Sequence, residues 1–202
     1  MSGKAHAQAG IPINAVVRSD LSWLKAEIPL SIGILIAGTG KWDDQAADIV
    51  LWTDASLRLA LSFTYAGNGF VYQLRPCPAD TKIDIFFLEL VAILSAIHHV
   101  ASFTHPPRRI LLFTDSLDSV AAFNSLGTSE TLHNGPLLGV ASIVLRTGVD
   151  IHVRHIMGSE NIRADLLSRL LFSEYKRKFP SDRVRTFEPP RELLPARWRE
   201  CF

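Results

Sequence analysis

Short apolar runs in the middle of the chain have the pattern of β-strands. A β-branched and aromatic run at 49–52 stops at the polar sequence Thr-Asp-Ala-Ser at 53–56. Two further apolar stretches, at 59–65 and 70–74, flank Ala-Gly-Asn-Gly at 66–69, and an Asn-Gly pair is typical of the turn that closes an antiparallel hairpin. The pattern therefore predicts three successive antiparallel strands.

From residue 84 onward the pattern changes to helices that alternate with strands. Residues 84–101 contain no glycine or proline and are apolar on nearly every face, which predicts a helix that is buried on most sides. The strands that follow are expected at 109–114 and 150–156, and the helices at 116–125, 136–146 and 161–176. Strands joined by helical crossovers run parallel. The sequence thus predicts an α/β fold with a mixed five-stranded sheet, three antiparallel strands and then two parallel strands, flanked by helices.

The two ends of the chain differ from this middle part. Residues 1–47 begin polar and carry a short amphipathic patch with Leu21, Trp23 and Leu24, which we interpret as an N-terminal arm or connection segment. Residues 179–202 contain four prolines and mixed charges, so we expect a linker or an extended peptide on the surface. One domain is therefore expected at 48–178.

Charge and composition narrow the class of protein but do not identify a partner. The 21 basic and 20 acidic residues give a net charge of +1, so any site for a polyanion must come from local clustering. Two cysteines, Cys77 and Cys201, are too few for a disulfide scaffold or a cysteine zinc site, which favours an intracellular compartment, cytoplasmic or nuclear. The apolar run at 28–37 is interrupted by Pro29 and Gly33 and is shorter than the roughly 20 residues that a bilayer requires, so no membrane partner is expected.

Four acidic residues occupy positions where folding alone gives little reason for an acid. Because the carboxyl ends of neighbouring parallel strands meet at one edge of a sheet, Asp54 and Asp115 are expected side by side. Glu89, inside the apolar helix, and Asp165, in the first turns of the last helix, can reach the same edge. Buried like charges repel by several kcal/mol unless a cation lies between them. Carboxylate oxygens select Mg²⁺, or Mn²⁺, over zinc.

Each acid also has a purely structural interpretation. Asp54 could cap a turn with Ser56, and Asp115 could be the N-cap of the helix that follows it. Asp165 could form a surface ion pair with Arg169, four residues on. For Glu89 no such interpretation is at hand, because a charge among phenylalanines and leucines needs a partner.

The segments that carry these acids resemble the ribonuclease H domain of retroelement reverse transcriptases, in particular those of gypsy-like and DIRS-like elements, with a fungal source implied. The matching segments are Thr-Asp-Ala-Ser at 53–56, Glu89 on its helix, Thr-Asp-Ser at 114–116 and His-Ile-Met-Gly-Ser-Glu-Asn-Ile-Arg-Ala-Asp-Leu-Leu-Ser-Arg at 155–169. The last is the most specific, being similar to the family pattern His-Ile-Pro-Gly, two residues, Asn, two residues, Ala-Asp, one residue, Leu-Ser-Arg. The resemblance covers about 48–172. A weaker similarity links 20–23 and 42–43 to the segment that joins polymerase to ribonuclease H in such elements.

The resemblance implies an enzyme that hydrolyses the RNA strand of an RNA/DNA hybrid, next to an upstream reverse transcriptase domain of the same polyprotein. It implies two Mg²⁺ ions, one activating a water and one stabilising the leaving 3′ oxygen. The residues that would bind these ions and act in catalysis are Asp54, Glu89, Asp115 and Asp165. Two positions depart from the family: Ala60 stands where glycine is usual, which would narrow the approach of the substrate backbone, and Met157 stands where proline is usual.

Substrate contacts are expected from a second set of residues. Ser56 follows the first acid, and Asn161, one helical turn before Asp165, can orient the substrate or that carboxylate. A basic stretch along the last helix could follow the phosphates, or could equally be a solvated helix face. Its members in the predicted contact set are Arg163, Arg169 and Lys176.

Two other function classes remain open. A module of the same fold could bind nucleic acid or act as a scaffold without catalysis, and the complete set of four acids favours the enzyme over it. A nuclease of the same fold could instead cut DNA, and the 161–169 pattern favours the hybrid over that substrate. Cleavage assays on hybrid and on duplex DNA would separate these alternatives.

Overall fold

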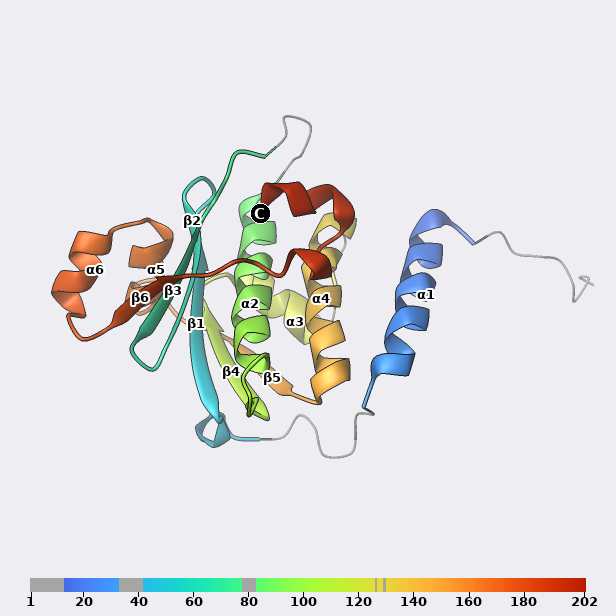
Figure 1. Ribbon diagram of the computed structural model, residues 1–202, viewed down its shortest axis with the longest axis horizontal. Coiled ribbons are helices and arrows are strands. Elements are labelled where there is room, and N and C mark those ends of the chain that lie inside the picture. Colours follow the sequence, from blue (N-terminus) through green and yellow to red (C-terminus); the bar gives the residue numbers. More distant parts are fainter. Residues whose placement is uncertain (1–12, 33–41, 78–82, 126, 129) are drawn as a thin grey trace, which may run out of the picture.

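A six-stranded mixed sheet divides the protein into two layers of helices (Figure 1). The computed structural model describes residues 13–32, 42–77, 83–125, 127–128 and 130–202. The strands lie in the order β5–β4–β1–β2–β3–β6. Their bounds are β1 Ile49–Ala55, β2 Ala60–Tyr65, β3 Asn68–Gln73, β4 Arg109–Thr114, β5 Asp150–His155 and β6 Arg183–Thr186.

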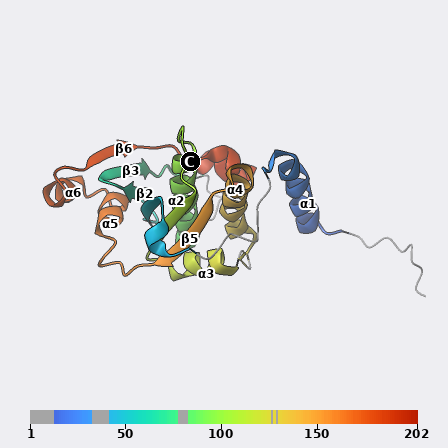
Figure 2. The ribbon, with the colours of Figure 1, turned by 90° about the horizontal axis from the view of Figure 1, so that it is seen from below.

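Helices of very different length cover the two faces of this sheet. The longer ones, with α3, lie on one face and the short pair α5 and α6 on the other (Figures 1 and 2). Their bounds are α1 Ala15–Glu27, α2 Ile85–Ala101, α3 Leu117–Ser125, α4 Thr131–Thr147, α5 Ile162–Ser168 and α6 Phe172–Lys178. Short 3₁₀ turns lie at Ile28–Leu30, Asp44–Ala46, Arg191–Leu193 and Ala196–Cys201.

The predicted α/β class and the predicted mixed sheet, antiparallel strands first and parallel strands after them, are confirmed. β1 pairs antiparallel with β2, and β2 with β3, whereas β4 runs parallel to both β1 and β5. The prediction of five strands was one short, because β6 adds to the free edge of β3 in parallel. We expected the tail that supplies β6 to be a linker or a surface peptide. The four residues of β6, Arg-Val-Arg-Thr, contain too few apolar side chains to indicate a strand.

The turn between β2 and β3 lies two residues earlier in the chain than the Asn-Gly pair suggested. Tyr65 lies opposite Asn68, so Ala66 and Gly67 form the turn, and both have positive φ angles, 44° and 73°. Asn68 and Gly69 instead begin β3. A Cβ on Gly69 would lie 2.7 Å from the Leu167 side chain, so the glycine serves the packing of α5 rather than the turn.

The helix expected at 161–176 is two helices. Leu170 adopts a left-handed conformation, φ 58°, between α5 and α6. Its N–H donates to the Leu167 carbonyl and the next N–H, of Leu171, donates to the Leu166 carbonyl, which is the paired bonding of a Schellman C-cap. Leu166 and Leu167 are buried, whereas Leu171 is 44% exposed, because the chain has reversed direction by then.

The helix expected at 136–146 begins five residues earlier, at Thr131, and Pro136 lies inside it rather than at its start.

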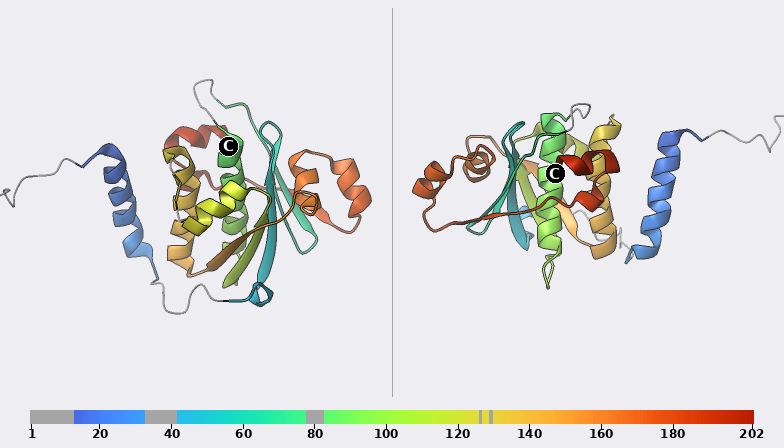
Figure 3. Two further views of the ribbon diagram at one scale, coloured as in Figure 1. Left: turned by 180° about the vertical axis from the view of Figure 1, so that it is seen from behind. Right: turned by 45° about the horizontal axis from the view of Figure 1, so that its top comes forward.

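The N-terminal patch forms part of α1, which Asn14 caps by accepting a hydrogen bond from the Val17 N–H. From α1, the Trp23 indole N–H donates to Ser142 on α4 at 3.1 Å. Within the arm, α1 therefore lies beside α4 (Figure 3).

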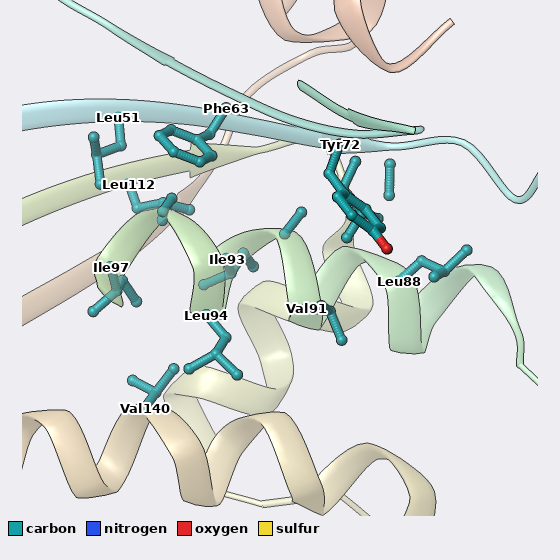
Figure 4. Packing of buried hydrophobic residues seen from close by; sticks show 14 of the residues in the cluster. Leu51, Phe63, Tyr72, Leu88, Val91, Ile93, Leu94, Ile97, Leu112 and Val140 are labelled. Carbon is teal, nitrogen blue, oxygen red and sulfur yellow. The ribbon is translucent and has the colours of Figure 1, made fainter. Parts of the chain in front are cut away.

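The core lies between the sheet and α4, with α2 in its centre (Figure 4). Ile97 and Ile93 of α2 lie on the side of Leu112 and the sheet, and Leu94 points toward Val140 of α4. The prediction of a helix buried on most sides is confirmed, since twelve of its residues are buried. No helix in the described ranges is long and apolar enough to cross a bilayer.

The C-terminal segment belongs to this core. Trp198 and Phe202 are 4% and 1% exposed, and both contact the ring of Phe87 on α2. The two cysteines that were too few for a scaffold form one bond, Cys77–Cys201, across a separation of 124 residues. The segment after β6 thus closes the top of the core in Figure 1, where the C-terminus is marked.

Candidate active site

Three carboxylates meet at the edge of the sheet where β1 and β4 end. Leu51 and Trp52 of β1 pair with Leu112 and Phe113 of β4 in parallel, so Asp54 and the residue after β4 emerge at the same edge. The ligand atoms of Asp54, Glu89 and Asp115 all lie within 4.8 Å of one another. They line an open pocket of about 450 Å³. The juxtaposition predicted from strand order is thus present for three of the four acids.

Asp54 is 6% exposed and is held by α5 from the opposite layer. Its Oδ2 accepts a hydrogen bond from the hydroxyl of Ser168, a fully buried residue at the end of α5. The pKa of Asp54 is raised to about 7, mainly by burial and in smaller part by the charges of Asp115 and Asp165. The hydrogen bond from Ser168 and the charge of Arg169 offset part of this rise. Asp54 is therefore an acid whose charged form is disfavoured by its surroundings.

Glu89 has the most unusual environment of the three. It is 6% exposed, and its Oε1 accepts the backbone N–H of Ala55 at 3.2 Å. Its Oε2 is buried with no hydrogen-bond partner in the described part of the chain. Burial, followed by the charges of Asp54 and Asp115, raises the pKa of Glu89 to about 9, and the bond from Ala55 only partly offsets this. A buried carboxylate oxygen without a hydrogen-bond donor is suited to be a ligand of a cation.

Asp115 is not the N-cap of α3. Ser116 takes that place, because its Oγ accepts the Ser119 N–H at 3.2 Å. The carboxylate of Asp115 is left to face the other two acids, with the loop after β5 close beside it. A Cβ on Gly158 in that loop would lie 3.1 Å from the Asp115 Oδ2, so the loop approaches closely only because the residue is glycine.

Asp54 likewise does not cap a turn with Ser56. The backbone N–H of Ser56 donates to the Ala60 carbonyl at 2.9 Å, and Ser56 itself lines the pocket beside Asp54. Ala60, where the family usually has glycine, is fully buried at the start of β2 and does not line the pocket. The expected narrowing of the substrate path at this position is therefore absent. Met157 is 59% exposed in the loop before α5.

Asp165 is set apart from the three clustered acids. Its Oδ1 accepts from the Nε of Arg169 at 2.5 Å, which is the ion pair that its structural interpretation predicted. The Asp165 side chain is 33% exposed at the rim, and its charge still contributes to the raised pKa of Asp54. The structure thus shows both the surface pair and an electrostatic link to the cluster.

The other predicted substrate residues differ in how they are placed. Asn161 is 1% exposed and its amide donates to the Thr53 carbonyl at 2.9 Å, so it fixes α5 against β1 and is out of reach of a substrate. Arg163 donates to Asp182 at 2.8 Å and lies over the ring of Phe179. Lys176 is exposed on α6, beyond the break at Leu170. A single basic helix face along 161–176 was therefore a wrong prediction.

Sequence reasoning missed two features. Ser168 lies three residues after Asp165, and only its place in the Leu-Ser-Arg motif could have indicated that it contacts Asp54. A second cluster, Asp84, Glu130 and His133, lies at the starts of α2 and α4, where His133 Nε2 is 2.9 Å from Asp84. No motif spacing joins these three residues, and Asp84 is also the N-cap of α2, accepting the Phe87 N–H.

The donor set of the first cluster fits a hard divalent cation. All of its ligand atoms are carboxylate oxygens, which Mg²⁺ and Mn²⁺ prefer, and no cysteine or histidine belongs to it. A cation would supply the charge that burial and mutual repulsion otherwise make costly, and it would displace protons from Asp54 and Glu89. The cluster can therefore hold a metal ion at an open cleft.

Comparisons with known proteins found only distant structural similarities. No protein-family model and no curated protein matches the chain. The RNase H1 of the halophilic archaeon Halobacterium salinarum NRC-1 is 18% identical over 62% of this chain and 98% of its own, with a TM-score of 0.44. LC11-RNase H1, isolated from compost by a metagenomic approach and solved in complex with an RNA/DNA hybrid, is 16% identical over 59% of this chain and 93% of its own, with a TM-score of 0.49. Function is therefore argued from the chain's own residues.

Proposed function

We propose that the protein is a metal-dependent endonuclease that hydrolyses the RNA strand of RNA/DNA hybrids. The observation that carries this proposal is the group Asp54, Glu89 and Asp115 at an open pocket, in which Asp54 and Glu89 are buried and one Glu89 oxygen has no donor among the described residues. The RNA/DNA hybrid as substrate is supported by the ribonuclease H-like motif at 155–169.

The proposed cofactor is a pair of Mg²⁺ ions, with Mn²⁺ as a substitute. Divalent ions in such sites lower the pKa of water and stabilise the charge that develops on a phosphodiester. Asp54, Glu89 and Asp115 would hold them, and Asp165 would contribute from the rim when it is released from Arg169. Ser168 orients the Asp54 carboxylate, and Ser56 lies in the pocket wall where the RNA strand would pass.

The biological setting belongs to the same proposal. The motif resemblance supports a role in the reverse transcription of a retroelement of fungal origin, with a reverse transcriptase domain upstream in the same polyprotein and an intracellular site of action, cytoplasmic or nuclear. The Cys77–Cys201 bond is of a kind more common in oxidising compartments, so the intracellular site rests on the proposed role alone.

The decisive experiment is cleavage of a labelled RNA/DNA hybrid by the purified chain with Mg²⁺, with and without a chelator. We expect RNA products with 5′ phosphate and 3′ hydroxyl ends, no cleavage with the chelator, and none by Asp115→Asn. Duplex DNA and duplex RNA serve as comparison substrates. Cleavage of duplex DNA in preference to the hybrid would show that the substrate assignment is wrong.

A binding module without catalysis is the second candidate, because Asp165 is engaged by Arg169 and lies outside the group of three acids. In that case the folded chain would bind the hybrid with the same affinity in Mg²⁺ and in chelator, and no products would form.

A further inference from the structure

A second pocket lies beside the carboxylate cleft, on the side of β2 and β3. It has a volume of about 350 Å³, and Leu57, in the turn after β1, lines both it and the cleft. Its walls are mostly apolar, from the Cys77–Cys201 bond and from Leu88 of α2. Among the described residues, the charged side chains that line it are two arginines, Arg58 and Arg75, and none of these lining residues is acidic.

The two arginines come from the same end of the β2–β3 hairpin. Ala60 pairs with Gln73, and the Leu74 N–H donates to the Leu59 carbonyl at 2.9 Å. Arg58, in the turn before β2, and Arg75, just after β3, therefore both lie where this pairing ends, and both line the same pocket.

In the parts of the chain that the structure describes, Arg58 and Arg75 form no ion pair with a carboxylate. Arginines elsewhere do, as Arg146 with Glu27 and Arg163 with Asp182. Two guanidinium groups that line one pocket, without a carboxylate partner among the described residues, form a local positive site in a chain whose net charge is only +1.

We propose that Arg58 and Arg75 bind backbone phosphates of the nucleic-acid strand where it leaves the carboxylate cleft. The inference rests on the proposed function for its ligand, and it extends the substrate path from Asp54 along the β1–β2 turn to the end of β3. Arginine is suited to this role because its planar fork of donors matches phosphate oxygens.

The test is binding of a short fluorescent RNA/DNA hybrid to the full chain in chelator, so that no cleavage occurs, followed by anisotropy over a range of salt concentrations. Each phosphate contact adds a slope of about 0.9 to the dependence of log affinity on log salt, so its loss weakens binding about eightfold at about 0.1 M salt relative to 1 M. The Arg58→Gln/Arg75→Gln variant should therefore bind about 60-fold more weakly, with a slope reduced by about 1.8.

Two further variants make the result specific. Arg108→Gln/Arg109→Gln removes the same charge from exposed positions at the opposite end of the sheet, where β4 begins, and should leave affinity and slope as in the unmodified chain. Arg58→Lys/Arg75→Lys keeps the charge and should recover the slope. Thermal melts of all variants confirm that each is folded.

The outcomes separate this inference from the proposed activity. A loss of affinity in the Gln double variant, in a chain that binds hybrid but never cleaves it with Mg²⁺, would refute the enzyme and support the phosphate site. Affinity unchanged in that variant, or reduced equally by Arg108→Gln/Arg109→Gln, would overturn the phosphate site whether or not the chain cleaves. Failure of the folded, unmodified chain to bind any nucleic acid would overturn it as well.

Discussion

Replacing Asp54 by asparagine should stabilise the metal-free protein at neutral pH while abolishing cleavage. Asparagine keeps a carbonyl oxygen that can accept the Ser168 hydroxyl bond, and it removes a charge that is buried beside Glu89 and Asp115. The substitution therefore imitates the protonated acid. It separates the cost of burying the charge, which is relieved, from the benefit of binding a cation, which is lost.

The size of the effect follows from the pKa of Asp54. Burial raises it to about 7 from an ordinary value of 3.8, so between these values the folded state keeps a proton that the unfolded chain has released. The free energy of unfolding of the native sequence therefore falls as pH rises from about 4 to about 7, and then levels off as far as Asp54 is concerned. A shift of about 3 pKa units corresponds to about 4 kcal/mol, which is the upper bound on the stability gain of Asp54→Asn above pH 7.

Urea unfolding followed by tryptophan fluorescence in chelator, at several values between about pH 4 and about pH 8, measures this difference. The two proteins should be equally stable near pH 4 and diverge as pH rises. Added Mg²⁺ should then stabilise the native sequence, by about 2.7 kcal/mol at a hundredfold excess over its dissociation constant, and the variant much less. A variant that is less stable than the native sequence at neutral pH would refute the reasoning, because the carboxylate would then be a structural acceptor.

Three further predictions concern the same architecture. Glu89→Gln should weaken Mg²⁺ binding and activity together, and unchanged binding by titration calorimetry would remove Glu89 from the site. Ser168→Ala should reduce Mg²⁺ affinity by about tenfold through loss of the bond that orients Asp54, the usual scale for a residue that positions a metal ligand; Ser125→Ala, a hydroxyl that bonds only within its own α3 region, is the control and should change nothing. Trp198→Ala should lower the free energy of unfolding by about 3–5 kcal/mol, because a large side chain in the core is lost; a change below about 1 kcal/mol would mean that the C-terminal segment is not part of the core.

The parts of the fold that sequence could predict are those fixed by local pattern. The long apolar run of α2 predicts a buried helix, and the short apolar runs of β1 and β4 predict buried strands. From the order of these elements we could predict that Asp54 and Asp115 lie close together. The hairpin turn was misassigned because Asn68-Gly69 has strong turn propensity. Its glycine is required instead by Leu167, a residue almost a hundred positions away, and no local rule carries that information.

The structure of the second half of the domain was harder to predict, because it too depends on contacts between residues far apart in the sequence. The break at Leu170 places a leucine at positive φ, where glycine is usual, so no residue signals the end of α5. β6 has four exposed residues and is a strand only because the edge of β3 is available to it. Both features depend on tertiary contacts outweighing local preference. The partners of Arg163 and Asn161 could not be predicted for that reason, since they are set by where these segments come to lie.

The contacts of α5 give the 155–169 motif a physical meaning. Asn161 binds the β1 backbone, and Ser62 of β2 donates to the Ala164 carbonyl at 2.8 Å, with Ala164 itself fully buried. A larger side chain than alanine would push the helix off the sheet at this point. With one face of α5 fixed in this way, Ser168 is delivered to Asp54 and the preceding acid, Asp165, is turned to the rim of the cleft. Asparagine, alanine and serine in the motif therefore hold α5 against the sheet, whereas the acid between them, Asp165, takes no part in that packing and pairs with Arg169 instead.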